Sequence, residues 1–464
     1  MLLLNSMKKA LLSALVLGAV LLASLYAAKS AKSVGHQEII KKLEDKIIPD
    51  QYIVVYKDSV ANPDSVTDEQ EKLHLLKSKF RFNKVLKGYT AVFTSEKLDK
   101  IKSDPRVAFV TEDKEITIAQ WWRRKKSPTP TRTPTPTRSP TPPSSSSPTP
   151  TKTPTPTPTT AITTQTIPSG VSRIGLTTNE GAGVGVAILD TGIDLDHPDL
   201  SGNLVANKTC ISGTSTGDDD QGHGTHVAGT VAALNNSIGV IGVAPQAKLI
   251  AVKVLNSQGS GSYSTLICGI DWVTANASNY NIKVANMSLG GGGSSDNNCG
   301  NSNNDALHKA ICKARDAGIT FAVAAGNNAS NASNTVPAAY NDAVITVSAL
   351  ADSDGQPDGL GPNTSYGKDD TFATFSNYGS VVDLGAPGVS ILSTLRGGGY
   401  TTMSGTSMST PHVAGAAALY LKMNPGASWS QVRDGLIAVG EPQNSGHTDL
   451  SGLHSEKVVR ADSL

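Results

Sequence analysis

The stretch GVGVAILDTG, residues 183–192, decides the fold class of this chain. Its apolar residues follow one another almost without interruption, which is typical of a strand buried on both faces of a parallel sheet. The run closes at Asp190 and a Thr-Gly turn follows. Later segments repeat the pattern and are predicted to be further strands: KLIAVKVL (248–255), KVANMSLGG (283–291), TFAVAAGN (320–327) and AVITVSAL (343–350).

Helical segments alternate with these strands. They are HVAGTVAALN (226–235), STLICGIDWVTANA (264–277) and NDALHKAICKARDAG (304–318). This alternation predicts an α/β fold, with a doubly wound, mostly parallel sheet and helices on both faces. In such sheets the chemistry lies in loops at the carboxyl ends of the strands. The glycine cluster at 181–185 is not a dinucleotide-binding fingerprint, because it precedes its strand.

The N-terminus has the composition of a secretory signal peptide, which we assign to residues 1–28. Two lysines precede an apolar run from Ala10 to Ala28 that ends in small residues. The sequence therefore predicts a secreted, extracellular protein. Because the run is near the lower length limit for a membrane span, a protein anchored to the cell envelope by an uncleaved segment is the alternative.

A proline-rich segment divides the rest of the chain. In residues 127–160 proline stands at nearly every second position, which removes backbone donors and forces an extended conformation. We assign this linker to residues 121–163 and the large domain to residues 164–464. At about 3.1 Å per residue the linker can reach on the order of 100 Å.

A compact α+β unit precedes the linker. We assign it to residues 50–120, after a lead segment of residues 29–49. It is barely large enough for a core of its own. Its predicted elements are a strand at 51–56, a helix at 68–80, a strand at 87–94, a helix at 96–104 and a strand at 106–113.

Charge is distributed unevenly, although the net charge of the chain is only +1. Residues 29–126 contain 21 Lys and Arg against 15 Asp and Glu, a net charge of +6. Residues 167–464 contain 14 against 24, a net charge of −10. Opposite potentials favour docking of the two parts, although each value is also ordinary for a soluble domain. The small overall charge argues against nucleic acid as the main partner.

Four cysteines lie in the large domain, at positions 210, 268, 299 and 312. In an exported chain an even number suggests two disulfides, with three possible connectivities. The short separation favours Cys299–Cys312, which leaves Cys210–Cys268. Buried free thiols are the alternative, and the spacing excludes a CxxC zinc site.

Four polar residues lie where catalytic loops are expected. Asp190 closes the first strand, His223 stands between two glycines, Asn327 ends the strand at 320–327, and Ser407 lies in a cluster of hydroxyls. Nucleophilic acyl transfer needs a hydroxyl, a base that takes its proton, and an acid that orients the base. It also needs a donor for the oxyanion, often an amide side chain. The four residues supply this set.

Each of these residues also has a structural interpretation. Asp190 could close an ordinary turn, and the hydroxyl cluster could cap a helix at Ser409 or Thr410 with Pro411 in its first turn. His223 and His226 could be a pair of metal ligands, but no further His or Cys nearby completes a zinc site.

Five motifs together resemble the subtilisin-like serine proteases. They are LDTGID (189–194), GHGTHVAG (222–229), MSLGG (287–291), VAAGN (323–327) and GTSMSTPHVAG (405–415). They occur in the family's order and cover the chain from about Thr164 to its end. The resemblance implies a serine endopeptidase in which Asp190 orients His223, His223 is the general base and acid, and Ser407 is the nucleophile.

The same resemblance assigns roles to the neighbours of the nucleophile. Asn327 and the backbone N–H of Ser407 would stabilise the oxyanion. Ser409 and Thr410 would support the start of a helix, and His412 would be structural.

The unit that precedes the linker resembles the inhibitory propeptide of these enzymes. This implies a self-inhibited, autoprocessed precursor, whose segment VTEDKEITIAQ (110–120) ends in the active-site groove and is cut near Ile118 to Gln120. The mature enzyme would then keep a proline-rich N-terminal arm, and the alternative is a second cut near Thr164 that removes it. The implied partners are protein and peptide substrates and the chain's own propeptide, and we expect a monomer. A module that binds peptides without turnover is the alternative.

By resemblance, substrate binds as an added strand between GSGSY (259–263) and SLGG (288–291). The implied binding residues are Gly259, Gly261, Tyr263, Leu266, Ser288, Leu289, Gly290 and Ala338. Tyr263, Leu266 and Leu289 would line an apolar pocket distant from the cut, and Ala338 would help to floor the main specificity pocket. Broad preference for apolar or aromatic side chains is therefore expected.

Calcium is the cofactor that the resemblance implies, because ALNNSIGV (233–240) is similar to the family's calcium loop. The implied ligands are the side chains of Gln165, Asp199 and Asn236 and the carbonyls of Leu234, Ile238 and Val240. Ligation by oxygen alone suits Ca²⁺, and a plain Asn-Asn turn is the alternative. A second acidic run, with Asp352, Asp354 and Asp358, could bind another ion.

Overall fold

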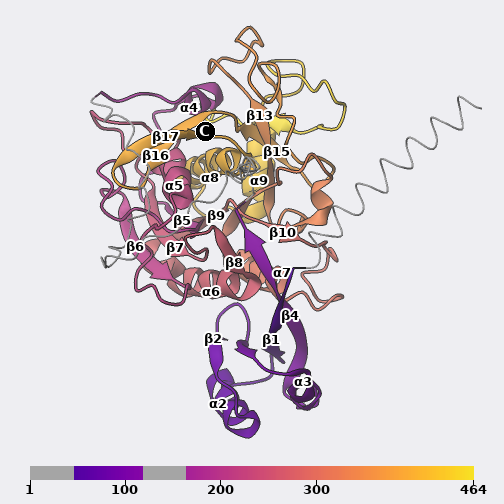
Figure 1. The fold of residues 1–464 in the computed structure, drawn as a ribbon. Coiled ribbons are helices and arrows are strands. Elements are labelled where there is room, and N and C mark those ends of the chain that lie inside the picture. Colours follow the sequence, from indigo (N-terminus) through magenta and orange to yellow (C-terminus); the bar gives the residue numbers. More distant parts are fainter. Residues whose placement is uncertain (1–45, 119–163) are drawn as a thin grey trace, which may run out of the picture.

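The structure, a computed structural model, describes residues 46–118 and 164–464. Residues 46–118 form a small N-terminal unit beside a larger C-terminal domain of residues 164–464 (Figure 1). The predicted signal peptide and the Pro/Thr-rich linker lie outside the described residues.

A nine-stranded sheet runs through the C-terminal domain as described here. Its order is β18-β15-β13-β11-β9-β5-β7-β6, with β14 paired to β13. Every pairing in it is parallel except that of β14. The strands are β5 (Gly185–Asp190), β6 (Leu204–Thr209), β7 (Lys248–Lys253), β9 (Ile282–Met287), β11 (Thr320–Ala324), β13 (Ile345–Ala351), β14 (Thr371–Phe372), β15 (Leu384–Pro387) and β18 (Lys457–Val458).

Alternate residues of β5 enter two different cores. Ala187 and Leu189 pack with residues of α6 (Tyr263–Tyr280) and α7 (Ala306–Asp316) on one face of the sheet. Val186 and Ile188 pack with the helices of the other face. These helices are α4 (Ser169–Ile174), α5 (His223–Ala232), α8 (Thr406–Met423) and α9 (Trp429–Val439). The predicted doubly wound sheet with helices on both faces is confirmed.

Short strands complete the C-terminal domain. β16 (Ile391–Leu395) and β17 (Gly399–Met403) form a hairpin. β10 (Gly291–Gly292) pairs with β12 (Thr335–Val336), which follows the 3₁₀ turn Ala332–Asn334.

Two disulfides join Cys210 to Cys268 and Cys299 to Cys312. The connectivity favoured by the sequence is therefore the one found, and the alternative of free thiols is wrong. The second bond ties the long loop that follows β10 to α7, so that this loop is anchored at the side of the sheet.

The N-terminal unit is an antiparallel sheet covered by two helices. Its elements are β1 (Ile47–Tyr56), α2 (Pro63–His74), β2 (Ser78–Phe82), β3 (Gly88–Val92), α3 (Ser95–Lys102) and β4 (Val107–Thr117). Its strand order is β2-β3-β1-β4, and β4 pairs in turn with β8 (Ser260–Ser262) of the C-terminal domain. A small core that includes Val54, Tyr89 and Ile101 holds the unit together.

The predicted helix at 68–80 is wrong in its second half. Helix α2 ends at His74, because Leu75 adopts a left-handed conformation with φ of 50°. Ser78 then donates its backbone N–H to the carboxylate of Glu71, and the following residues pair with β3. Alternation of polar and aromatic residues in SKFRF was the available strand signal.

Candidate active site

Asp190 and His223 are brought together where β5 ends and α5 begins. Asp190 is the last residue of β5 and His223 the first of α5. The Nδ1 atom of His223 lies 2.8 Å from Oδ1 of Asp190, and both side chains are buried. Because the carboxylate accepts a hydrogen bond from Nδ1–H, Nε2 is the ring atom left to exchange a proton with another group.

A buried aspartate organises the loop before His223. Asp219 accepts the backbone N–H groups of Gln221, Gly222 and Thr225. At Gly224 a Cβ atom would lie 2.1 Å from the carbonyl oxygen of Gly192, so only glycine lets α5 approach the end of β5 this closely. The position of the His223 ring is thus fixed from its own loop and from the sheet.

Ser407 lies in the first turn of α8. Its hydroxyl donates to the carbonyl of Ser288 at 3.1 Å, and in return the Ser288 hydroxyl donates to the Ser407 carbonyl at 2.9 Å. Pro411 lacks the N–H that would bond to that carbonyl within the helix, so the Ser288 hydroxyl supplies the missing donor. This exchange joins the start of α8 to the segment after β9.

The predicted start of this helix is wrong. α8 begins at Thr406 with Gly405 as its N-cap, and it therefore contains Ser409 and Thr410. Thr410 bonds to the Thr406 carbonyl one turn back, and the Ser409 hydroxyl has no partner among the described residues. Hydroxyl residues favour caps, so their cluster is a poor indicator of where this helix begins.

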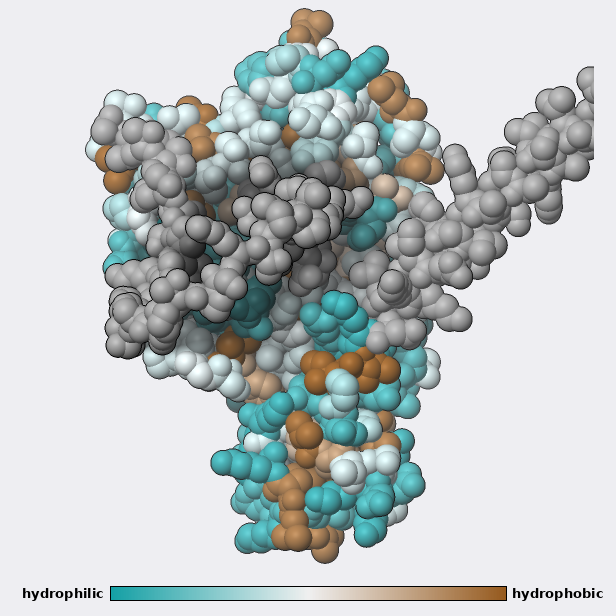
Figure 2. All heavy atoms as spheres, viewed as in Figure 1, coloured by the Kyte–Doolittle hydropathy of each residue, from teal (hydrophilic) through white to brown (hydrophobic). Residues whose placement is uncertain are grey.

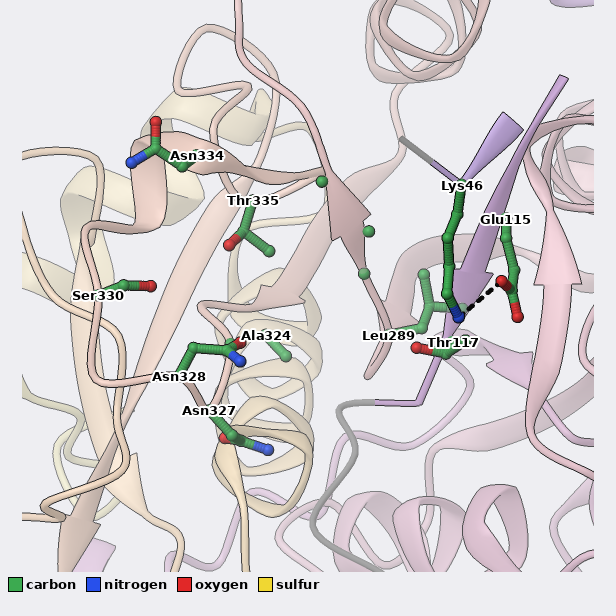
Figure 3. Close-up of a pocket in the computed structure, with 14 residues that line it drawn as sticks. Lys46, Glu115, Thr117, Leu289, Ala324, Asn327, Asn328, Ser330, Asn334 and Thr335 are labelled. Carbon is green, nitrogen blue, oxygen red and sulfur yellow. Dashed lines mark ion pairs between the residues drawn. The ribbon is translucent and has the colours of Figure 1, made fainter. Parts of the chain in front are cut away.

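Asn327 follows β11 and points into a cavity. Its Oδ1 atom accepts both the backbone N–H and the hydroxyl of Thr406, each at 2.8 Å. The Nδ2 group is therefore turned away from Thr406 and can donate elsewhere. Figure 3 shows Asn327 and Asn328 on one side of the cavity and Leu289 on the other. The volume of the cavity is about 270 Å³.

Strand β4 of the N-terminal unit lies between the two predicted substrate-binding segments. On one side it pairs antiparallel with β8, with Ile116 opposite Gly261. On the other side Thr117 and Gly290 exchange two backbone hydrogen bonds of 3.0 Å. The N–H of Ile118 donates to the carbonyl of Gly259 at 3.0 Å. In Figure 1, β4 rises from the N-terminal unit into the C-terminal domain near β8 and β10.

The side chain of Ile116 is fully buried in an apolar cluster that residues of both units form. The same cluster contains Tyr263, Leu266 and Leu289, the three residues predicted to line an apolar pocket. Ala338 is also fully buried, but it does not line the cavity of Figure 3. The structure thus gathers the predicted binding residues around β4 with the exception of Ala338, and substrate binding by all of them stays a prediction.

Two carboxylates hold the N-terminal unit on helix α6. Asp113 accepts the backbone N–H and the hydroxyl of Ser264 in the first turn of α6. Burial raises the pKa of Asp113, and its hydrogen bonds oppose this rise. From α6, Asp271 accepts the backbone N–H groups of Lys84 and Val85 at 2.8 and 2.9 Å. Neither residue could be predicted from the sequence, since an isolated aspartate carries no signal of its partner.

Most of the predicted calcium ligands converge. The Nε2 atom of Gln165 lies 2.7 Å from the Leu234 carbonyl, 3.3 Å from the Val240 carbonyl and 3.5 Å from Oδ1 of Asn236. Asp199 is buried and accepts from the Asn236 amide and the Val240 N–H. The oxygens of Leu234, Asn236 and Val240 therefore face one point. The side-chain N–H group of Gln165, which carries a partial positive charge, occupies this point. No contact places the Ile238 carbonyl there, and its role stays a prediction.

The two other histidines near the site are buried and neutral. Burial lowers the pKa of His226 to about 3 and that of His412 to about 4. His226 bonds to the carbonyls of Ile391 and Thr401, and His412 bonds to that of Met408. These hydrogen bonds give His226 a structural role. They replace the interpretation of His223 and His226 as a pair of metal ligands.

Two parts of the chain match known families. Residues 181–449 match the Subtilase family, and residues 51–119 match the family described as Peptidase inhibitor I9. The chain belongs to the subtilase family. It is therefore a serine endopeptidase that carries an inhibitor-type propeptide, and the alternative of a module without turnover is set aside.

Bacterial subtilisins are among its relatives. Subtilisin DY of Bacillus licheniformis is 44% identical over 280 residues, which cover 59% of this chain and 90% of that protein. Subtilisin Savinase of Lederbergia lenta is 41% identical over 307 residues, which cover 64% and 100%. The crystal structure of a cold adapted subtilisin-like serine proteinase matches with a TM-score of 0.52 and 36% identity, over 64% of this chain and 98% of that one.

Replacement of Asp271 by Ala should loosen the N-terminal unit. The substitution removes the two short hydrogen bonds that this carboxylate accepts. A hydrogen bond to a charged group contributes about 1.5–3 kcal/mol to the free energy of association. We expect the unit to dissociate from the cleaved complex about tenfold faster or more. The appearance of activity on a chromogenic peptide measures this rate. Asn279→Ala, on the exposed side of the same helix, is the matched control, and equal rates for both variants would contradict the assignment.

Proposed function

We propose that Asp190, His223, Ser407 and Asn327 are the catalytic residues of this endopeptidase. The observation that carries the proposal is the position of β4, which lies as an added strand beside the segment whose Ser288 carbonyl contacts the Ser407 hydroxyl. A peptide in the same place brings its backbone carbonyls past Ser407.

The reaction follows from this geometry. The Ser407 hydroxyl turns from the Ser288 carbonyl toward Nε2 of His223, which takes its proton as Oγ attacks the peptide carbonyl. The Asp190 carboxylate stabilises the imidazolium that forms. The Nδ2 group of Asn327 and the N–H of Ser407 donate to the developing oxyanion. His223 then gives the proton to the leaving amine. Water takes the place of the amine, and the same steps in reverse hydrolyse the acyl-enzyme and restore Ser407.

The register of β4 supports a proposal for the bond that is cut during maturation. Thr117 is opposite Gly290 in an antiparallel pair. Ser288, whose carbonyl contacts Ser407, is two residues before Gly290, so the bond to be cut is expected two residues after Thr117 in the sequence. We therefore assign the first cut to the Ala119–Gln120 bond. The N-terminal unit then inhibits the enzyme as a product that stays in the groove.

Apolar side chains are the preferred substrate residues in this proposal. Ile116 is the fourth residue before the proposed cut and belongs to the buried apolar cluster that contains Tyr263, Leu266 and Leu289. Backbone pairing to Gly261 and Gly290 does not depend on sequence. Broad specificity, set mainly by apolar contacts, follows.

Calcium binding at the loop of residues 234–240 stabilises the enzyme. The carbonyls of Leu234 and Val240 and the Asn236 side chain face Nε2 of Gln165. Amide oxygen and nitrogen exchange places by a flip of the side chain, after which Gln165 presents a fourth oxygen. Asp199 supplies the charge. This set of hard oxygen donors suits Ca²⁺.

The proposed setting is extracellular, where the enzyme acts as a monomer on protein and peptide substrates. The signal peptide assigned to residues 1–28 supports export. Within the described ranges 46–118 and 164–464, no helix has the length and apolarity needed to cross a membrane.

Replacement of Asn327 by Ala should lower kcat by about 10²–10³ with little change in KM, the range known for removal of this donor from a subtilisin. Steady-state kinetics on a chromogenic peptide measures both constants. Asn328→Ala is the control, because Asn328 lines the same cavity and should stay within a few-fold of wild type. Similar losses in the two variants would show that Asn327 has no special role.

Chelation of calcium should speed thermal inactivation of the mature enzyme. Removal of the ion leaves the oxygens of the loop facing one another, which destabilises the start of the C-terminal domain. The half-life of activity at elevated temperature, with and without EDTA, is the measurement. Asn236→Ala should shorten the half-life in calcium while Ser237→Ala should not. A half-life that EDTA leaves unchanged would refute calcium stabilisation.

A further inference from the structure

The segment between β13 and β14 carries five aspartates, at positions 352, 354, 358, 369 and 370. It forms loops at the top of Figure 1, and Figure 2 shows mainly hydrophilic atoms there. The acidic run in the sequence suggests a group of Asp352, Asp354 and Asp358. The structure instead places oxygens of Asp352, Asp354 and Asp369 within 4.8 Å of one another, whereas Asp358 lies with Asp369 and Asp370.

Asp352 is the residue that requires an explanation. Its side chain is 2% exposed. Oδ1 accepts the N–H of Gly355 at 3.1 Å, but Oδ2 is buried and has no hydrogen-bond partner among the described residues. A buried carboxylate oxygen without a partner is costly, because burial removes its water without replacement.

Protein cations do not balance this charge. Arg173 is fully buried nearby and pairs with Asp370 at 2.8 Å and with Glu441 at 2.8 Å. Within the described residues, the other four aspartates of the segment form no ion pair. Asp370 is fully engaged, since its second oxygen accepts the N–H groups of Asp358 and Gly359.

The remaining oxygens define a site. Asp352 has one unpartnered oxygen, and Asp354 uses only Oδ1, which accepts the N–H of Gln356 at 2.9 Å. Oδ1 of Asp369 accepts both the backbone N–H and the hydroxyl of Ser353. Oδ2 accepts only the N–H of Gly361 and therefore keeps a second lone pair. Asp354 is exposed, which leaves room for water ligands.

We propose that Asp352, Asp354 and Asp369 bind a divalent cation, Ca²⁺ by the hardness of the oxygen donors. The ion joins the beginning of the segment to its end, beside the Arg173–Asp370 pair that anchors α4. This site is separate from the loop of residues 234–240 and does not depend on the proposed role of that loop.

Calorimetric titration of the calcium-depleted full-length chain with CaCl₂ tests the proposal. Ser407→Ala serves as the parent, because it avoids self-digestion. Asp354→Asn should bind one ion fewer than the parent, or bind that ion at least tenfold more weakly. Asp358→Asn removes the same charge from the same segment outside the three ligands and should bind as the parent does. Unchanged stoichiometry and affinity in Asp354→Asn would overturn the proposal.

Thermal unfolding of Asp352→Asn gives a second, independent readout. Without calcium this variant should melt at a higher temperature than the parent, because the uncompensated buried charge is gone. With calcium the order should reverse, because the variant has lost a ligand. A melting temperature that rises with calcium as much as the parent's would contradict the assignment.

Discussion

The parallel pairing of β5, β9 and β11 is the constraint on which the site depends. Because parallel strands place their carboxyl ends at one edge, Asp190, Ser288 and Asn327 all emerge on the same side of the sheet. Helices α5 and α8 return from that edge and bring His223 and Ser407 to it. The bonds of Asp190 to His223 and of Thr406 to Asn327 then fix the side chains relative to each other. No single loop could position all these groups.

Backbone pairing links inhibition to substrate binding. Thr117 and Gly290 exchange hydrogen bonds that any extended peptide can form, so an inhibitor and a substrate with different side chains can use one groove. What distinguishes the N-terminal unit is its attachment outside the groove. Asp113 and Asp271 bind it to both ends of the contact with α6. The opposite net charges of the two parts agree with this docking. The hydrogen bonds of Asp113 and Asp271 do not follow from net charge, because one carboxylate belongs to the N-terminal unit and the other to the C-terminal domain.

Much of the fold could be predicted because its signals are local. The buried strands are short apolar runs, and the motifs that carry Asp190, His223 and Ser407 are contiguous in sequence. The end of α2 was predicted wrongly, although β2 pairs with the nearby β3 and its alternating residues were a local strand signal. The start of α8 was also predicted wrongly, because the contact of Thr406 with Asn327 is made with a distant segment. For the same reason the sequence indicated neither Asp271, whose partners are backbone groups 186 and 187 residues away, nor the grouping of Asp369 with Asp352.

The most direct test of the account is the mass of the N-terminal fragment that maturation releases. Wild type and Ser407→Ala, expressed in the same host, would be compared by intact mass and terminal sequencing. The register of Thr117 with Gly290 predicts a fragment that ends at Ala119 in wild type, and an uncut Ala119–Gln120 bond in Ser407→Ala. Cleavage of that bond to the same extent in both proteins would show that Ser407 does not perform it, and a wild-type chain that stays uncut would contradict the account.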